Sequence, residues 1–401
     1  MSLLAVAEAQ AQLLAMAEPL PAERLDLLAA RGRYLAEPLV ALRDQPWADL
    51  SAMDGYAIRH ADLPGPWRIA GASQAGGTPP TATLRPGEAM RIFTGAPLPP
   101  GADCVLLQED AAAQGDQMSL SGDAPERIGR HVRRRASDFA KGMVVLEPGT
   151  AIGPTQIGLA AIAGHDRLPV HRIPRIVILS TGDELVPVGA PIGPGKLPSS
   201  NGLMLAAMLA QLGVEVSDMA LVPDNLAALT RAFEAASTAD IVVSIGGASV
   251  GDHDLVRPAI TAAGGNIDFW RIALRPGKPL MAGELGNACM LGLPGNPVSA
   301  FVTAVLFLLP LVRRFMGSRA PLPARARLES AIALPPGGNR TEYLRARVEQ
   351  NVVVQLADRD SAALRALADA DVLIERPVDA PAVAPGDPVW TIPIGAHGFA
   401  S

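Results

Sequence analysis

The spacing of apolar residues changes along the chain and predicts segments of different structure. Residues 2–17 have apolar positions at helical spacing, and a second helix is predicted for residues 22–30. Short β-type runs broken by Gly and Pro extend from Trp67 to Leu146 and predict a small β-rich domain. Short strands return after Gly317 and predict a second β-rich domain.

Strands and helices alternate from Pro174 onward, which predicts a parallel α/β sheet. Continuous apolar runs such as Arg175–Ser180 and Ile241–Val243 are typical of strands buried on both faces. A further strand is expected over Asp268–Leu274 and a last one over Cys289–Leu293, before a helix over Val298–Met316.

The predicted fold class is therefore multidomain α/β plus β. A central parallel α/β sheet domain is flanked by helical or extended, small β-rich and C-terminal β domains. The expected ranges are 1–48 together with 141–172 for the helical and extended linker domain, 49–140 for the small β-rich domain, 173–319 for the α/β domain and 320–401 for the C-terminal β domain.

Composition excludes several classes of function. The 34 Lys and Arg against 40 Asp and Glu give a net charge of −6, which argues against coating nucleic acid or an anionic membrane. Cys104 and Cys289 have neither disulfide-framework nor zinc spacing and fit a cytoplasmic location. No basic region precedes the first apolar residues, so no signal peptide is expected. The apolar run Val298–Val312 is shorter than the ~20 residues of a membrane span and predicts a buried helix.

The stretch Asp240–Asp254, DIVVSIGGASVGDHD, carries the most informative chemistry. It reads as a buried strand that turns through Gly246 and Gly247 and then presents Asp252 and Asp254. Ligands of open parallel sheets bind beyond the carboxyl ends of the strands, where glycines allow close approach and exposed N–H groups favour anions. Carboxylates beside an anion would repel it unless a cation lay between them, which indicates a site for phosphate and Mg²⁺. Taken alone, an ordinary strand-to-helix turn with capping acids explains the stretch equally well.

Several loops of the α/β unit are expected to meet at this edge of the sheet. TGDE, GGASVGDHD, RPGKP and LPGNP each follow a predicted strand, and Asp224 precedes a helix. Each has an ordinary alternative: Glu184 at a helix N-terminus, Lys278 in a solvated turn, Asn296 as an N-cap. Together they predict an enzyme that acts on a phosphorylated or nucleotide-linked small molecule with a divalent cation. P-loop, dinucleotide-binding, HExxH and GxSxG patterns are absent from the sequence.

Outside this unit the candidates are weaker. Asp54-Gly55 is a turn signal, and Arg91–Gly95 ends a predicted strand in a hydroxyl and a glycine. The basic run Arg133–Arg135 is interpreted as a solvated loop in preference to an anion clamp.

The motifs as a set resemble those of the molybdopterin molybdenumtransferases, the molybdenum insertases that include the catalytic part of gephyrin. The match covers nearly the whole chain, in family order: ALRDQPWADLSAMDGYA, RIFTGAPLPPGADCVLLQED, ASDFAKG, RIVILSTGDELV, SNG, SIGGASVGDHD, RPGKPL and LPGNPVSA. The resemblance implies an elongated four-domain homodimer with its site at the subunit interface. It also implies that adenylyl-molybdopterin and molybdate react, with Mg²⁺, to give molybdenum cofactor and AMP. Transient contacts with the adenylyltransferase and with recipient molybdoenzymes are implied as well. No nucleic acid or membrane partner is expected.

The resemblance also assigns site residues. Functional polar residues are expected at Asp54, Thr94, Asp138, Glu184, Asp224 and Asp254, of which Asp224 and Asp254 are the candidates for Mg²⁺. Arg275 and Lys278 match a cationic pair that would hold molybdate. The remaining implied substrate contacts are Gly246, Gly247, Ser249, Arg271, Pro276, Pro279, Gly295 and Asn296, with looser matches at Arg340 and Ser361.

The chain departs from the family pattern at a few positions. Arg275 replaces the usual Lys, and Arg271 is a second candidate for such a replacement; a guanidinium is a planar fork and not a point donor. Asn225 stands where a second Asp is common, and Ser199-Ser200-Asn201 lacks a preceding Asp. The alternative functions are the sister adenylyltransferase, which needs only one such α/β domain, and a non-catalytic scaffold of the gephyrin type, which needs a long disordered linker.

Overall fold

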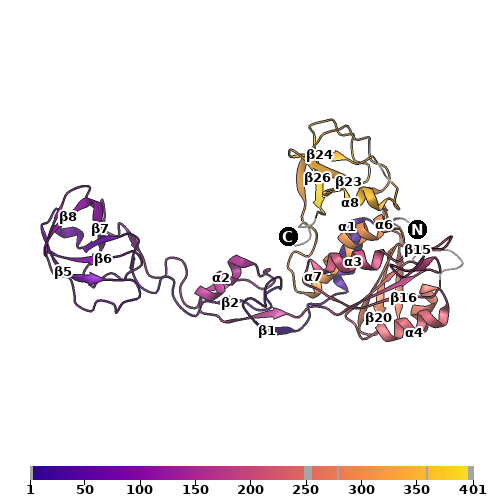
Figure 1. Ribbon diagram of the computed structural model, residues 1–401, viewed down its shortest axis with the longest axis horizontal. Helices are drawn as coiled ribbons and strands as arrows, with labels where there is room; N and C mark the ends of the chain where they lie inside the picture. Colours follow the sequence, from indigo (N-terminus) through magenta and orange to yellow (C-terminus); the bar gives the residue numbers. More distant parts are fainter. Residues whose placement is uncertain (1–2, 248–254, 278–279, 358–359, 396–401) are drawn as a thin grey trace.

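The chain folds into an elongated molecule with structural units strung along its long axis (Figure 1). The computed structural model describes residues 3–247, 255–277, 280–357 and 360–395. We refer to a distal unit at one end, a middle unit, and an α/β unit that packs against a C-terminal unit at the other end (Figure 1).

The distal unit is a six-stranded sheet in the order β7-β4-β6-β5-β9-β8. Its core packs around Trp67, whose side chain is almost completely buried. The strands are β4 (Gly55–Ile58), β5 (Trp67–Ser73), β6 (Glu88–Ile92), β7 (Cys104–Leu107), β8 (Ala111–Gln114) and β9 (Gln117–Leu120), with short 3₁₀ turns at His60–Asp62 and Gln108–Asp110. The small β-rich domain expected from the sequence is therefore found here.

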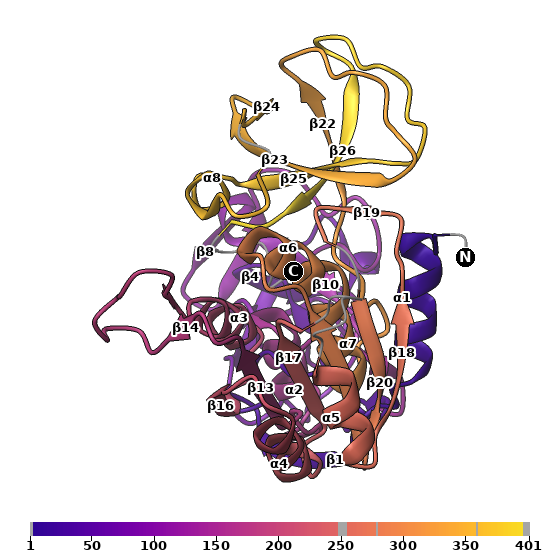
Figure 2. The same cartoon turned by 90° about the vertical axis from the view of Figure 1, so that its right-hand side faces the viewer.

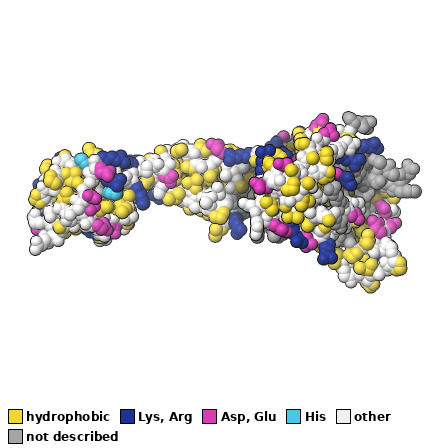
Figure 3. Space-filling model, turned by 90° about the horizontal axis from the view of Figure 1, so that it is seen from above, with side chains coloured by type: hydrophobic (Ala, Val, Ile, Leu, Met, Phe, Trp, Pro, Cys, Tyr) yellow, Lys and Arg dark blue, Asp and Glu magenta, His cyan; other side chains and the backbone are white. Residues whose placement is uncertain are grey.

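Two passages of the chain tether the distal unit to the middle unit. Short strands β3 (Leu50–Ser51) and β10 (Val132–Arg133) pair at its start. Arg134 then forms an ion pair with Asp49 at 2.5 Å, and Arg135 forms one with Asp44 at 2.6 Å. All three arginines of this basic run are exposed, as expected for a solvated segment, and Arg134 and Arg135 in addition join the two passages through these surface ion pairs. Figure 3 shows basic side chains near this narrow part of the molecule.

The middle unit corrects one element predicted from the sequence. Residues 22–30 were expected to be helical, but β1 (Ala22–Asp26) is a strand that pairs antiparallel with β12 (Arg167–His171). Local apolar spacing is a weak determinant, and pairing with a distant strand overrides it. The unit is completed by β2 (Leu39–Val40), β11 (Val144–Leu146) and α2 (Pro154–Ile162).

The α/β unit contains a six-stranded sheet in the order β16-β13-β17-β21-β20-β18. The first four are parallel, but β20 runs antiparallel to both of its neighbours, so the sheet is mixed. Strand β20 was not predicted from the sequence. The strand expected over Asp268–Leu274 is β18, which ends earlier, at Trp270. The strands are β13 (Ile176–Thr181), β16 (Val216–Val222), β17 (Ile241–Ile245), β18 (Asn266–Trp270), β20 (Leu280–Leu285) and β21 (Ala288–Leu293), with a small ladder of β14 (Leu185–Val186) and β15 (Leu197–Pro198).

Helices cover both faces of this sheet (Figure 2), and apolar clusters fill both layers. They are α3 (Asn201–Ala210), α4 (Leu226–Ala236), α5 (Val256–Ala262) and a continuous helix made of α6 (Pro297–Thr303), a π segment (Ala304–Leu308) and α7 (Leu309–Phe315). The continuous helix is long and apolar enough to span a membrane, but 94% of it is buried inside the protein. The expected buried helix is confirmed.

The N-terminal helix α1 (Val6–Ala15) packs against this continuous helix. Pro310 has no N–H to donate to the carbonyl of Leu306 four residues earlier. The side-chain amide of Gln10 donates to that carbonyl instead, at 2.8 Å. A polar residue of α1 thus satisfies a backbone group that the proline leaves open.

The C-terminal unit is a closed, barrel-like sheet in the order β19-β23-β24-β22-β26-β25, in which β23 also pairs with β25. Its strands are β22 (Ala326–Ser330), β23 (Thr341–Glu349), β24 (Val352–Gln355), β25 (Val372–Arg376) and β26 (Pro388–Pro393), with helix α8 (Leu364–Ala368). Strand β19 (Leu274–Arg275) comes from the RPGKP segment and pairs with β23. The α/β unit therefore contributes a strand to the C-terminal sheet.

Candidate functional site

A cavity of about 720 Å³ opens at the carboxyl edge of the parallel strands. Three of the loops expected to meet at this edge, TGDE, the described start of GGASVGDHD and LPGNP, line this cavity together with Asp224. The described part of RPGKP does not line it and lies in a second cavity. The C-terminal unit adds Ala362 and Leu364 to the wall. The residues assigned from the sequence that line it are Glu184, Asp224, Gly246, Gly247, Gly295 and Asn296.

Local hydrogen bonds fix Asp224 in this cavity. The hydroxyl of Thr181, at the end of β13, donates to Asp224 Oδ1 at 3.0 Å. The backbone N–H of Asp224 donates to Asp183 Oδ1 at 3.2 Å, so two adjacent loops hold each other. Asn225 accepts the N–H of Ala228 at 2.9 Å and caps α4. The Asn at this position therefore has a structural role, and Asp224 carries the free carboxylate.

Close backbone approach explains one of the glycines. Gly246 has φ +92°, and a Cβ there would lie 2.5 Å from the carbonyl oxygen of Thr181. Only a residue without a side chain lets the turn after β17 lie against the end of β13.

The side chain of Asn201 contacts a distant loop. Helix α3 begins at Asn201 with no side-chain cap hydrogen bond. Asn201 Nδ2 donates instead to the carbonyl of Gly295 at 2.6 Å, which holds the LPGNP turn against the start of α3.

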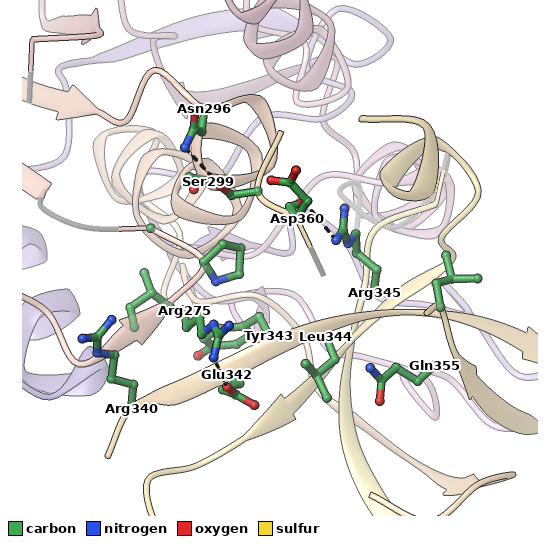
Figure 4. Close-up of a pocket in the computed structure, with 15 residues that line it drawn as sticks. Arg275, Asn296, Ser299, Arg340, Glu342, Tyr343, Leu344, Arg345, Gln355 and Asp360 are labelled. Atoms are coloured by element: carbon green, nitrogen blue, oxygen red, sulfur yellow. Dashed lines mark hydrogen bonds and ion pairs between the residues drawn. The ribbon is translucent and has the colours of Figure 1, made fainter. Parts of the chain in front are cut away.

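A second cavity, of about 430 Å³, lies between the α/β unit and the C-terminal unit (Figure 4). Four of the residues assigned from the resemblance line it: Arg275, Pro276, Arg340 and Ser361. Arg275 Nη1 lies 3.3 Å from Glu342 Oε1, and its side chain is 61% exposed. The Nε atom of Arg340 is buried and has no hydrogen-bond partner among the described residues.

Asn296 and Ser299 line both cavities and form the boundary between them. Asn296 Nδ2 donates to Ser361 Oγ at 3.0 Å, and the N–H of Val298 donates to the Ser361 carbonyl at 3.0 Å. The sequence analysis did not single out Ser299 or Glu342. Ser299 lies inside LPGNPVSA, which could have indicated it, whereas nothing local distinguished Glu342.

The distal candidates are not brought to these cavities within one chain. The N–H and hydroxyl of Thr94 donate to Asp54 Oδ1 at 2.7 and 2.9 Å, and these two bonds hold the pKa of Asp54 below its ordinary value. Asp54 precedes β4 and Thr94 follows β6, in the unit farthest from the α/β sheet (Figure 1). Asp138 is exposed in the tether.

The remaining assigned residues are accounted for as follows. Arg271 is exposed and is not part of either cavity wall as far as the described residues show. Ser249, Asp254, Lys278 and Pro279 lie outside the described residues.

Comparison with known protein families identifies three consecutive regions of the chain. Residues 4–164 match the model of the MoeA N-terminal region (domain I and II), 177–314 match a probable molybdopterin binding domain, and 326–394 match the MoeA C-terminal region (domain IV).

Full-length relatives agree with these matches. A molybdopterin molybdenumtransferase of Haemophilus influenzae is 39% identical over 75% of this chain and 74% of that protein. Molybdopterin molybdenumtransferase 2 of Mycobacterium tuberculosis is 35% identical over 91% of this chain and 94% of that protein. The crystal structure of the molybdopterin biosynthesis moeA protein from Pyrococcus horikoshii OT3 has a TM-score of 0.84 at 25% identity, covering 98% of this chain and 100% of that one. The chain therefore belongs to the molybdopterin molybdenumtransferase family and is a transferase.

Proposed function

We propose that this chain inserts molybdenum into molybdopterin: adenylyl-molybdopterin and molybdate react to give molybdenum cofactor and AMP. The observation that carries the proposal is the pair of adjoining cavities at one edge of the α/β sheet. Glycine turns and carboxylates line one, arginines line the other, and Asn296 and Ser299 line both. An organic phosphate and a small oxyanion can therefore bind side by side.

The larger cavity suits adenylyl-molybdopterin. Its volume of about 720 Å³ lies in the range of ordinary small-molecule sites. Gly246 and Gly247, both with positive φ, allow the backbone to lie directly against the substrate. Asn201 keeps the LPGNP turn in place on the opposite wall.

Mg²⁺ fits this cavity through oxygen donors. Thr181 occupies only Oδ1 of Asp224, and Glu184 lines the same wall. Mg²⁺ is usually bound by one or two carboxylates together with substrate phosphates. We assign Asp224 and Asp254 as its ligands; bound there, the ion would stabilise the charge of the AMP leaving group.

The smaller cavity suits molybdate, a dianion. Arg340 offers a buried Nε–H that has no partner in the described part of the chain, and a guanidinium matches an oxyanion with parallel N–H donors. Arg275 can exchange Glu342 for the anion, because their contact is long and exposed. The sequence adds Lys278 to this set.

We further propose that the active form is a homodimer. Asp54, Thr94 and Asp138 lie on the distal unit and its tether, away from the cavities of their own chain (Figure 1). A second copy can supply them if its distal unit covers the cavity edge of the first. We also propose that the reaction takes place in the cytoplasm, a reducing compartment with which the two free cysteines are compatible.

Replacing Arg340 by alanine tests the molybdate assignment. Loss of its charge-assisted hydrogen bonds is expected to raise the KM for molybdate about 10- to 100-fold. The assay is conversion of adenylyl-molybdopterin at varied molybdate. The matched control is Arg327→Ala, because Arg327 lies over the Trp390 ring, 5.0 Å from its centre, and lines neither cavity among the described residues. A folded R340A enzyme with an unchanged molybdate KM would refute the assignment.

A further inference from the structure

We propose that Arg345 is a positioning residue for molybdate binding, which acts by holding the Asp360–Ala363 turn and thereby Ser361. The inference rests on the proposed function, since it takes the smaller cavity as the molybdate site. Arg345 lies on β23 and is one of the residues that line the smaller cavity, but only 5% of it is exposed. Its guanidinium donates to two backbone carbonyls of the turn, and its role is therefore exerted through that turn.

The guanidinium of Arg345 spans the turn. Nη1 donates to the carbonyl of Ala363 at 2.8 Å, and Nη2 donates to the carbonyl of Asp360 at 3.1 Å (Figure 4). The two ends of the turn are thus bound by one rigid, planar group. Lysine cannot reproduce this, because its ammonium is a single point donor on a flexible stem.

The turn is fixed from the other side by the α/β unit. Asn296 donates to the hydroxyl oxygen of Ser361, and the Val298 N–H donates to its carbonyl. Within the turn, the Ala362 N–H donates to Asp360 Oδ1 at 3.0 Å. The turn that carries Ser361 is therefore held on one side by Arg345 of β23 and on the other by Asn296 and Val298 of the LPGNPV segment. We call these contacts the clamp.

This clamp determines what the Ser361 hydroxyl can do. A hydroxyl has one proton and two lone pairs, and the bond from Asn296 uses a lone pair. The proton of Ser361 remains available to donate into the cavity that the residue lines. An oxyanion needs such a donor at a fixed position, so loosening the turn should weaken molybdate binding more than it slows the saturated enzyme.

The test compares two buried arginines of the same sheet. Arg376 on β25 is also 5% exposed and donates to two backbone carbonyls, those of Pro335 and Pro381 at 2.8 and 2.6 Å. Arg376 is the cross-strand neighbour of Glu342, and Arg376→Lys keeps its charge. Neither proline lines the two cavities among the described residues. Steady-state molybdenum insertion is measured for R345K and R376K at varied molybdate, with thermal unfolding of both.

We expect R345K to raise the KM for molybdate about fivefold with kcat nearly unchanged, and R376K to leave both at their wild-type values. A double-mutant cycle with Ser361→Ala should be non-additive, so that S361A adds little to R345K. If R345K fails to fold, Arg345→Gln replaces it, because a neutral amide still reaches one carbonyl without burying a charge.

The outcomes distinguish the positioning role of Arg345 from the molybdate site itself. If S361A raises the molybdate KM but R345K matches R376K, the positioning role is overturned and the molybdate site stands. Additive effects in the cycle overturn it as well, because Arg345 would then act independently of Ser361. If neither S361A nor R340A changes the molybdate KM, the proposed site itself is refuted.

Discussion

Combining two inactive variants tests whether each site is built from two copies of the chain. Asp54→Asn keeps an oxygen that can accept from Thr94, so the distal unit should fold normally. Asp224→Asn likewise keeps an acceptor for Thr181 in the larger cavity. Each variant alone removes one carboxylate from every site of a symmetric dimer, and both are expected to be inactive.

A heterodimer of the two variants should recover activity. If the distal unit of one copy covers the cavity of the other, one site receives both native aspartates and the second site receives neither. The heterodimer, isolated by two different affinity tags, should therefore have about half of the wild-type activity. The assay is insertion of molybdenum at saturating molybdate and adenylyl-molybdopterin.

The matched control pairs D54N with Thr94→Val. Both changes lie on the distal unit, so each site of that heterodimer carries one of them and no activity should return. A D54N–D224N heterodimer no more active than its parents would refute the shared site.

Two further predictions concern the packing that supports the site. Gln10→Leu removes the donor to the Leu306 carbonyl and should destabilise the protein by about 1–2 kcal/mol in urea denaturation, whereas Gln12→Leu on the exposed face of the same helix should be neutral. Burial acts to raise the pKa of Asp240, but hydrogen bonds from the Arg172 side chain and the Arg175 N–H outweigh it and hold the pKa below its ordinary value. The pair should therefore stabilise the protein above about pH 4 and lose this effect as the pH falls through the lowered pKa. Asp240→Asn should lower the free energy of unfolding by about 1–2 kcal/mol at pH 7, less than for a buried pair because the Arg172 side chain is 37% exposed. The difference in unfolding free energy from the wild type should shrink at pH 3. An equal difference at both pH values would contradict this.

The sequence was informative about the cavity edge because a parallel sheet has only one place for its carboxyl ends. Asp224, Gly246 and Asn296 were expected together from strand order alone, and all line the larger cavity. Arg340 and Ser361 came only from the resemblance to a family, since nothing in their local pattern indicates an oxyanion site. Both line the smaller cavity.

Other features depended on contacts between distant segments. Strand β1 was predicted as a helix, because its pairing with β12 cannot be read from residues 22–26 themselves. The partner of Asn201 is a carbonyl 94 residues away, and that of Gln10 is 296 residues away. The spacing of apolar residues specifies which face of an element is buried, but it does not specify what packs against it.

By itself, the sequence determined the fold class, the loops at the cavity edge and the membership of a family. Only the tertiary structure decided that the residues proposed to bind molybdate lie between two units, where Asn296 donates to Ser361 from one side and Arg345 holds its turn from the other. The physical reason is the difference between local and long-range determinants. Each parallel strand places the loop that follows it at the same edge of the sheet, and the strand and its loop are adjacent in the sequence. The hydrogen bonds that hold Ser361 join residues far apart in the sequence, and only folding brings them together.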